Sequence, residues 1–365
     1  MGFNCGIVGL PNVGKSTLFN ALTEAAQAEA ANYPFCTIEP NVGRITVPDE
    51  RLDALAKVAK SAKVLPTQLE FVDIAGLVRG ASRGEGLGNQ FLANIREVDA
   101  ILHLLRCFEG ETTHVEGSVD PIRDAETIDT ELMLADLDSV ERQLEAVRKK
   151  AKSGEKDARI RMEVLEPVAE ALREGRPARS VALTPEQKPL LRQLHLMTSK
   201  PILYVSNVEE EAVTTGNALS RRVEERARAE GAGHVVISAA IEAEVAALGD
   251  PEEKQAFLAD LGLQESGLAR VIREGHRLLD LLTFFTVGPK EARAWTVRRG
   301  AKAPEAAGVI HSDMERGFIR AETIHWRDFV ECGGEAGAKE AGKMRVEGRE
   351  YAVQDGDVFH FRFNV

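Results

Sequence analysis

The segment at residues 9–16, GLPNVGKS, constrains the fold of this 365-residue chain more than any other feature. It has the spacing G-x-x-x-x-G-K-[ST], follows an apolar run that ends at Val8, and precedes a helix-like stretch that begins at Thr17. In such a loop the glycines let the backbone curl until its N–H groups point at phosphate oxygens, and the helix N-terminus adds a favourable dipole. We therefore expect a phosphate-binding loop (P-loop) in which Lys15 supplies positive charge and Ser16 offers a hydroxyl to Mg²⁺.

Short apolar runs alternate with helix-like stretches as far as about Glu126, and this alternation is typical of a parallel sheet. The predicted buried strands are residues 4–8, 44–47, 69–73 and 100–106, and two more follow at 201–206 and 234–238. The chain is therefore predicted to have an α/β fold, with the mostly parallel sheet of a Ras-like P-loop NTPase.

A helical segment interrupts this sheet pattern. Apolar residues recur at spacings of 4, 3, 4 and 3, which is typical of a narrow helical seam: Met133, Leu137, Val140, Leu144 and Val147. A charged interruption around Gly154 separates them from a second seam, so we expect an inserted antiparallel helical hairpin, or coiled coil. Pro167 falls inside the second helix and should kink it or mark its early end.

Beyond about Leu282 the pattern changes to short strand-like pieces at 284–287, 294–297, 318–321 and 357–363, which predicts a separate small α+β domain. The predicted organisation has four parts. The nucleotide-binding domain comprises residues 1–127 and 198–281, the hairpin domain lies between its parts at 128–197, and the C-terminal domain covers 282–365.

Composition limits the partners and the compartment. Forty-six Lys and Arg against 58 Asp and Glu give a formal net charge of −12, so no DNA partner is expected and any RNA contact must be local. The four cysteines form no C-x-x-C pair, which indicates neither a zinc site nor a disulfide framework and fits a reducing cytoplasm. No apolar segment approaches the roughly 18 residues of a membrane span, so we expect a cytoplasmic protein without a membrane partner.

Further residues have the chain order of a nucleotide switch. Asp73 ends an apolar run and begins D-I-A-G, where a carboxylate at a strand tip can hold a metal-bound water and the N–H of Gly76 can reach a γ-phosphate. Thr37 lies between the P-loop and Asp73, in a loop that begins NYPFCT. With Ser16, these residues form the predicted site for Mg²⁺ and the γ-phosphate, although Thr37 is alternatively an ordinary loop hydroxyl.

The segment 207–210, NVEE, occupies the place where guanine-specific switch proteins usually carry N-K-x-D after a strand. Val208 replaces the Lys whose stem would line the base, and Glu210 is one methylene longer than the Asp that would bind guanine. Preference for GTP should therefore be weakened. Asn207 matches the Asn of the N-K-x-D motif and remains a candidate for the base pocket. Ser238 and Ala239 end the last predicted strand and suit the loop that completes the base pocket.

Together, GLPNVGKS, NYPFCTIEPN, DIAGLVRGASRGEGLGNQFL and NVEE resemble the YchF or Obg-like ATPase family of translation-factor-related P-loop proteins. The similarity spans nearly the whole chain, including the inserted hairpin and a C-terminal end that resembles a TGS domain, a ubiquitin-like β-grasp module. The resemblance implies that the chain binds and hydrolyses ATP at least as well as GTP, in association with ribosomes.

The resemblance also assigns roles to residues of this chain. The residues expected around the phosphates are Asn12, Val13, Gly14, Lys15, Ser16 and Thr17. Val208 would lie near the adenine, and Mg²⁺ would be bound by Ser16 and Thr37, with Asp73 holding a coordinated water. Asn12 also resembles the P-loop Asn of potassium-dependent relatives, which leaves K⁺ as an open alternative.

Leu77 follows DIAG, where many GTPases place a Gln that orients the attacking water. An aliphatic side chain cannot orient water, so hydrolysis by the free protein should be slow unless another polar group enters. The resemblance points to His114, whose neutral imidazole can position water or accept its proton. As an exposed loop histidine, it would alternatively do neither.

Two basic groups are candidate RNA contacts. At the hairpin tip, Glu155 and Asp157 are outnumbered by Arg148, Lys149, Lys150, Lys152, Lys156, Arg159 and Arg161. In the C-terminal domain, Lys290, Arg293, Arg298, Arg299 and Lys302 lie near Trp295. Basic helical tips are as often merely solvated.

Three functions therefore compete. The leading one is a ribosome-associated switch that hydrolyses ATP slowly with Mg²⁺. The alternatives are a ribosome-linked GTPase and a non-catalytic, nucleotide-gated module that binds RNA or ribosomes, in which His114 has no role.

Overall fold

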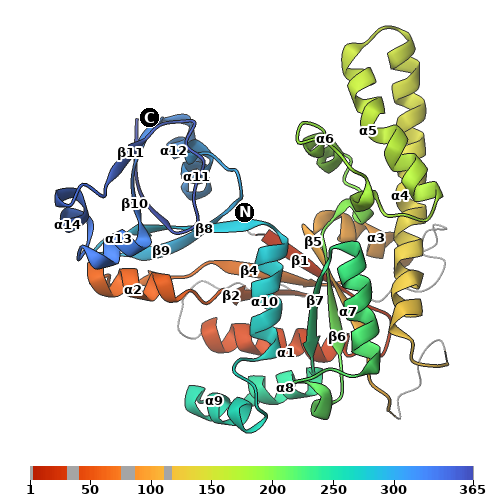
Figure 1. The fold of residues 1–365 in the computed structure, drawn as a ribbon, viewed down its shortest axis with the longest axis horizontal. Helices are drawn as coiled ribbons and strands as arrows, with labels where there is room; N and C mark the ends of the chain where they lie inside the picture. Colours follow the sequence, from red (N-terminus) through yellow and green to blue (C-terminus); the bar gives the residue numbers. More distant parts are fainter. Residues whose placement is uncertain (1–2, 31–40, 75–86, 111–116, 365) are drawn as a thin grey trace. The chain divides into compact units, whose positions relative to one another are not determined.

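The computed structural model describes residues 3–30, 41–74, 87–110 and 117–364 (Figure 1). Contacts divide these residues into two compact units. The larger unit comprises residues 3–44 and 70–278, and the smaller one comprises 45–69 together with residues from 279 onward. Residues 45–69, which the sequence analysis assigned to the nucleotide-binding domain, thus pack with the C-terminal residues.

A mostly parallel sheet forms the centre of the larger unit, with strand order β2-β4-β1-β5-β6-β7. Its strands are β1 (Phe3–Val8), β2 (Val42–Thr46), β4 (Gln68–Asp73), β5 (Ala100–Arg106), β6 (Ile202–Asn207) and β7 (Gly233–Ile237). Parallel pairing joins β1 to β5, β5 to β6, and β6 to β7. The predicted α/β fold of a P-loop protein is confirmed, and the carboxyl ends of the central strands meet at one edge.

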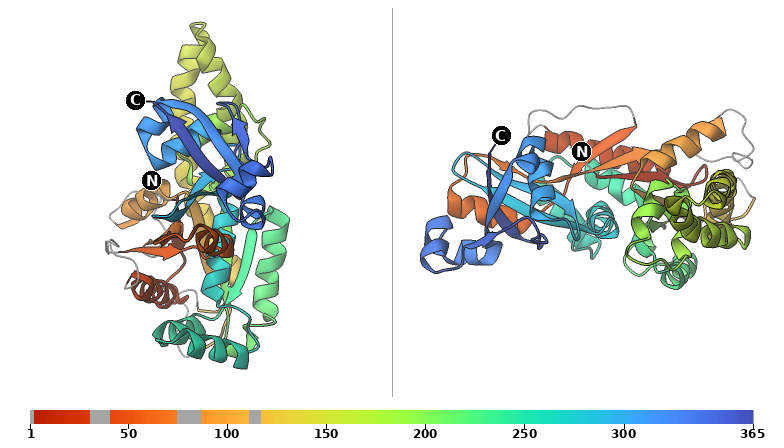
Figure 2. Two further views of the ribbon diagram at one scale, coloured as in Figure 1. Left: turned by 90° about the vertical axis from the view of Figure 1, so that its left-hand side faces the viewer. Right: turned by 90° about the horizontal axis from the view of Figure 1, so that it is seen from above.

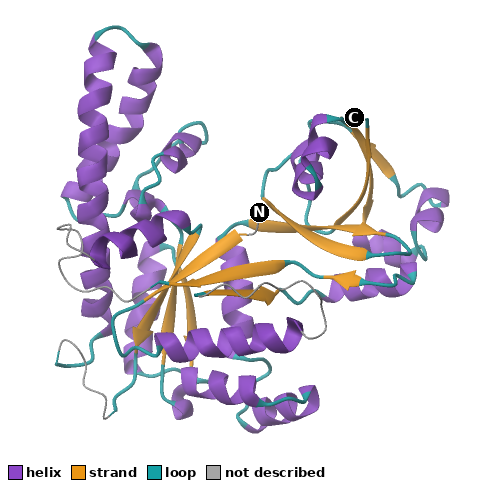
Figure 3. Ribbon diagram, turned by 180° about the vertical axis from the view of Figure 1, so that it is seen from behind, coloured by secondary structure: helices purple, strands orange, loops and turns teal. Residues whose placement is uncertain are grey.

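Helices cover both faces of this sheet (Figure 3). They are α1 (Lys15–Ala30), α3 (Leu87–Glu97), α4 (Pro121–Lys152), α7 (Ala218–Glu230), α8 (Ala239–Ala247) and α10 (Gly267–Leu278). A further helix, α9 (Pro251–Asp260), packs against α8. Burial on both faces explains the mostly apolar sequence of β5, all seven residues of which are buried.

The inserted hairpin consists of α4 and α5 (Lys156–Arg173), which lie side by side (Figures 1 and 2). Their shared core includes Val140 and Leu144 from α4 and Val164 and Val168 from α5. Gly154 lies in the connecting turn with φ 92°, a left-handed conformation that glycine adopts without a steric penalty.

Two expectations for the hairpin need correction. Helix α4 begins at Pro121, before the predicted hairpin boundary at residue 128, because the Asp120 side chain caps its N-terminus by accepting hydrogen bonds from Ile122 N and Arg123 N. Pro167 does not end α5, which continues to Arg173. Burial of Val168 and the following turn against α4 offsets the backbone hydrogen bond that proline cannot donate.

The return from the hairpin passes through α6 (Lys188–Gln193) and is fastened to α4 by Asp136. This carboxylate is 1% exposed and accepts hydrogen bonds from Met197 N (3.0 Å), Thr198 N (2.7 Å) and Thr198 Oγ1 (2.7 Å). Because buried carboxylates need such donors, Asp136 holds the two ends of the insertion together.

The smaller unit contains a mixed sheet of order β11-β10-β12-β8-β9-β3. Its strands are β3 (Val64–Leu65), β8 (Leu281–Val287), β9 (Ala292–Arg298), β10 (Phe318–His325), β11 (Arg345–Glu347) and β12 (Asp357–Phe363). Its helices are α2 (Glu50–Ala59), α11 (Ala303–Ile310), α12 (Ser312–Arg316), α13 (Trp326–Glu331) and α14 (Glu335–Glu340).

Aromatic and aliphatic packing explains this unit. Phe284 lies in edge contact with Phe359 and Phe361, with ring centroids 5.5 and 6.2 Å away. Leu52 and Leu55 of α2 are buried in the same core cluster as Phe285, which ties residues 45–69 to the C-terminal strands. In the described parts of both units, no helix is long and apolar enough to cross a membrane.

Candidate functional site

The P-loop connects β1 to α1 and has the backbone shape that phosphate binding requires. Asn12 and Gly14 have φ angles of 65° and 93°, so the loop curls back before α1 begins at Lys15. Lys15, Ser16 and Thr17 occupy the first turn of this helix, whose N–H groups lack intrahelical acceptors. The predicted cradle for phosphate is therefore at a helix N-terminus.

Lys15 and Asp73 meet although they are 58 residues apart. The Lys15 Nζ atom lies 2.5 Å from Asp73 Oδ1, and the two side chains are only 12% and 19% exposed. The contact follows from topology, because β1 and β4 are neighbours and both end at the same edge of the sheet. The lysine expected to bind phosphate and the carboxylate expected to hold a metal-bound water therefore belong to one site.

Asn207 joins three predicted parts of the site. Its side chain is 4% exposed; Nδ2 donates a hydrogen bond to Val13 O (3.0 Å), and Oδ1 accepts one from Ala239 N (2.9 Å). A Cβ atom on Gly14 would collide with the Asn207 amide, so the close approach requires glycine there. Asn207 thus positions the P-loop against residues 238–239.

The remaining base-pocket candidates lie at the ends of β6 and β7. Val208 is buried, and its N–H donates to Ile237 O at 2.9 Å. Ser238 is buried directly before α8, while Glu210 is exposed and begins a short 3₁₀ turn. The adjacent Glu209 carboxylate accepts hydrogen bonds from Asn217 Nδ2 at 3.0 and 2.9 Å. The structure brings segments 207–210 and 238–239 together.

Arg106 is a residue of this site that sequence reasoning missed. It ends β5, pairs in register with Asn207, and is 1% exposed. Its Nε donates to Phe108 O at 3.1 Å, its Nη1 lies 3.5 Å from Asn12 O, and the guanidinium covers the Phe108 ring at 4.6 Å. The only sequence signal was a charged residue at the end of a mostly apolar strand.

Four predicted residues lie outside the described residues: Thr37, Gly76, Leu77 and His114. Among the residues that are described, one group of side chains has the spacing of a metal site, namely Glu322, Glu335 and His360 in the smaller unit. Its carboxylate Glu322 already binds Arg362 at 3.0 Å. The predicted Mg²⁺ site is distinct from this group, since Ser16 and Asp73 lie in the larger unit.

Comparison with known proteins agrees with this geometry. A family model described as a 50S ribosome-binding GTPase matches residues 4–135, and the C-terminal model of the YchF GTPases, described as a protein of unknown function, matches residues 281–364. The ribosome-binding ATPase YchF of Haemophilus ducreyi is 60% identical over 366 residues, and its counterpart in Bacillus subtilis is 57% identical over 368; both alignments cover 100% of each chain.

A solved structure supports the same assignment across the whole fold. The YchF GTPase of Schizosaccharomyces pombe matches with a TM-score of 0.87 and 36% sequence identity, covering 99% of this chain and 98% of that one. The matching relatives, the two family models and the fold show that the chain belongs to the YchF family.

Proposed function

We propose that this protein is a magnesium-dependent ATPase that acts on ribosomes, which would place it in the cytoplasm. The observation that carries the proposal is the contact of Lys15 with Asp73 beside a P-loop that Asn207 holds against residues 238–239. The relatives named ribosome-binding ATPases support both the nucleotide and the partner.

In the proposed complex, residues 12–17 surround the phosphates, and Lys15 leaves Asp73 to bind them. Ser16 and Thr37 would hold the magnesium ion, with Asp73 accepting a hydrogen bond from a water on it. The ion would neutralise charge on the β- and γ-phosphates. The N–H of Gly76 would donate to the γ-phosphate, as the DIAG motif predicts.

Base selection would depend on Val208 and Glu210 near the rim formed by Ser238 and Ala239. An apolar, buried Val208 offers no lysine stem, and the exposed Glu210 extends one methylene beyond the usual aspartate. A pocket without the guanine clamp would accept adenine. A ribosome-linked GTPase is the second candidate, because both family models and the S. pombe relative carry the name GTPase.

Slow hydrolysis is proposed because Leu77 cannot orient the attacking water. His114 would take that role, since a neutral imidazole can position water or accept its proton. We expect His114→Ala to retain the Kd for ATP but to lower kcat by about 10² or more. Unchanged kcat would remove His114 from the mechanism and favour a module that merely binds nucleotide.

The proposal is tested by titrating ATP and GTP in parallel, with and without Mg²⁺, and by measuring phosphate release with and without ribosomes. We expect ATP affinity at least equal to GTP affinity and slow release that ribosomes change. Tight, exclusive binding of GTP would replace the ATPase by the second candidate. Absence of any magnesium-dependent binding would refute both.

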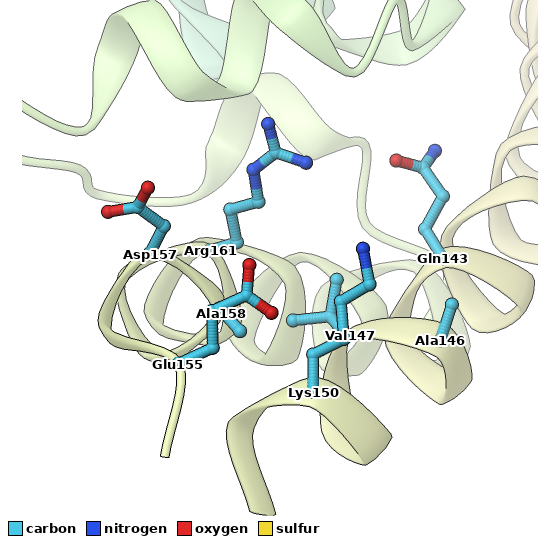
Figure 4. Close-up of a pocket in the computed structure, with 8 residues that line it drawn as sticks. All are labelled: Gln143, Ala146, Val147, Lys150, Glu155, Asp157, Ala158 and Arg161. Atoms are coloured by element: carbon cyan, nitrogen blue, oxygen red, sulfur yellow. The ribbon is translucent and has the colours of Figure 1, made fainter. Parts of the chain in front are cut away.

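The hairpin tip is the proposed ribosome contact within the larger unit. Figure 4 shows the side chains of Lys150 and Arg161 pointing to the same side of α4 and α5, where with Gln143 they line an open pocket of about 380 Å³. Neither cation forms an ion pair with the described residues, whereas Arg148 pairs with Glu166 at 3.2 Å. Unpaired cations favour contact with RNA phosphates.

A further inference from the structure

A second pocket lies along β7. This strand is at the edge of the sheet in the larger unit (Figure 1). The pocket has a volume of about 280 Å³ and is bounded by residues 213–216, by α7 and by α10, which lie on either side of β7. None of the residues predicted to bind nucleotide or metal lines it. Its walls combine the hydroxyls of Thr214 and Thr215 with three arginines.

Two of these arginines have no hydrogen-bonded or ion-paired carboxylate among the described residues. Arg221, on the exposed side of α7, makes no side-chain hydrogen bond or ion pair with the described residues. Arg270 lies on α10. Its Nε and Nη2 atoms are buried and have no hydrogen-bond acceptor among the described residues. The third, Arg273, is held by Glu265 through contacts of 2.7 and 2.6 Å.

The carboxylates around this pocket already have partners. Glu242 and Glu265 lie close enough to Arg270 to interact with it electrostatically. The buried Glu242 carboxylate, however, accepts hydrogen bonds from Gly267 N (2.7 Å) and Leu268 N (3.0 Å), and Glu265 is engaged by Arg273. Arg270 therefore has nearby negative charge but no oxygen in hydrogen-bonding position.

The acidic residues on the pocket wall are likewise engaged. Glu224 pairs with Arg228 at 3.0 Å, and Glu274 pairs with Arg277 at 3.7 Å. His234 also lines the pocket, but its Nε2 is hydrogen-bonded to Ser206 Oγ at 2.9 Å, and burial lowers its pKa, so the ring is neutral. The unsatisfied groups of the pocket are consequently guanidinium donors.

We propose that this pocket binds a phosphate-type oxyanion, carried either by a small phosphorylated molecule or by an RNA backbone. Guanidinium groups match the tetrahedral oxygens of phosphate with paired, charge-assisted hydrogen bonds. Arg221 and Arg270 line the pocket from different helices. In the proposed complex, the Arg270 guanidinium would rotate so that its enclosed N–H groups donate to the bound anion. The hydroxyls of Thr214 and Thr215 add neutral donors.

The test measures thermal stabilisation of the full chain by inorganic phosphate at constant ionic strength. The P-loop is first saturated with magnesium and a non-hydrolysable ATP analogue, so that phosphate cannot act there. We expect the melting temperature to rise with phosphate concentration, and Arg221→Gln and Arg270→Gln each to weaken the apparent affinity about tenfold or more. Arg192→Gln, an exposed charge on α6, is the matched control and should respond like the wild type.

A parallel series uses a short single-stranded RNA in place of phosphate. One outcome is that RNA raises the melting temperature, phosphate does not, and both pocket substitutions abolish the effect of RNA. This outcome would support the oxyanion site and assign its ligand to RNA. Stabilisation by phosphate that both substitutions weaken would support a small phosphorylated ligand. The proposal would be overturned if neither probe stabilises the protein, or if Arg221→Gln leaves the stabilisation unchanged. Because Arg221 is exposed, its substitution should not impair folding.

Discussion

At the scale of single residues, the candidate site depends on buried polar side chains that hold backbone in place. Asn207 bonds the carbonyl of Val13 and the N–H of Ala239, and Arg106 lies between Asn12 and Phe108. Neither side chain needs to touch the nucleotide to affect its binding. Each fixes the distance between segments that must contact the same ligand.

We expect Asn207→Ala to weaken ATP binding about tenfold or more, because it leaves Val13 O and Ala239 N–H without their buried partners, at about 1–3 kcal/mol for each group. Isothermal titration with ATP and ADP would measure the change. Asn207→Asp retains the acceptor for Ala239 and loses the donor to Val13, so its affinity should be intermediate. Wild-type affinity in Asn207→Ala would show that Asn207 does not position the P-loop.

At the scale of elements, the hairpin is an insertion attached through a few buried contacts. Asp136 holds the return segment against α4, and Arg226 of α7 binds Asp129 of α4 at 2.6 Å. These contacts lie at the base of the hairpin, whereas its tip carries unpaired cations. Base and tip should therefore respond to different substitutions.

Asp136→Asn should destabilise the protein by about 1–3 kcal/mol, because the NH₂ group that replaces one carboxylate oxygen cannot accept the hydrogen bond from Met197 or those from Thr198. Urea unfolding followed by circular dichroism would measure the loss. Asp138→Asn is the matched control, since Asp138 is exposed and its pair with Arg142 should contribute less than about 1 kcal/mol. Equal effects of the two substitutions would contradict the role of Asp136.

The double substitution Lys150→Gln and Arg161→Gln should weaken ribosome binding and reduce its salt dependence. If each cation contacts one phosphate, the magnitude of the slope of log K against log salt should fall by about 1.4 to 1.8. Sedimentation with ribosomes at several salt concentrations would measure it. Arg142 is an exposed cation on α4 that is already paired with Asp138, so Arg142→Gln should change the slope little. If Arg142→Gln changed the slope as much as the double substitution does, the ribosome contact would lie away from the tip.

At the scale of the whole molecule, one buried histidine links stability to pH. His103 of β5 is 1% exposed and stacks on Tyr204 with ring centroids 5.7 Å apart, and neither ring nitrogen has a hydrogen-bond partner among the described residues. Burial is the main cause that lowers its pKa from 6.5 to about 3, and nearby Arg226 adds to the shift. The native ring therefore stays neutral where an unfolded chain would bind a proton.

The sign of the effect follows from proton binding. Below pH 6.5 the unfolded chain takes up a proton that the native His103 refuses until about pH 3, so the free energy of unfolding falls as pH decreases through this window. We expect His103→Phe to reduce the loss between pH 7 and pH 5 by about 2 kcal/mol. Urea unfolding at pH 8, 7 and 5 would measure it. If wild type and His103→Phe lost the same free energy of unfolding between pH 7 and pH 5, the linkage would be contradicted. Between pH 7 and 8 the two proteins should show the same dependence of this free energy on pH.

Local patterns in the sequence determined the P-loop, most of the strands and the two helices of the hairpin. Motif spacing and side-chain periodicity act over a few residues, so they are readable without a fold. Strand 100–106 was predicted with its observed bounds because β5 is mostly apolar and is buried on both faces. Pro167 predicted a kink or an early end of the second helix, and the early end is wrong. The local penalty of proline is readable from the sequence, whereas the packing of α5 on α4 is not.

Only the tertiary structure decided which distant residues meet. Strand order brings Lys15 to Asp73, the end of β6 places Asn207 against Val13, and packing assigns residues 45–69 to the C-terminal strands. Arg106 and Asp136 carry no motif, since their roles arise from groups far away in the chain. The physical reason is that the sequence encodes local conformation and burial directly, whereas contacts between distant segments depend on how all the buried surfaces fit together.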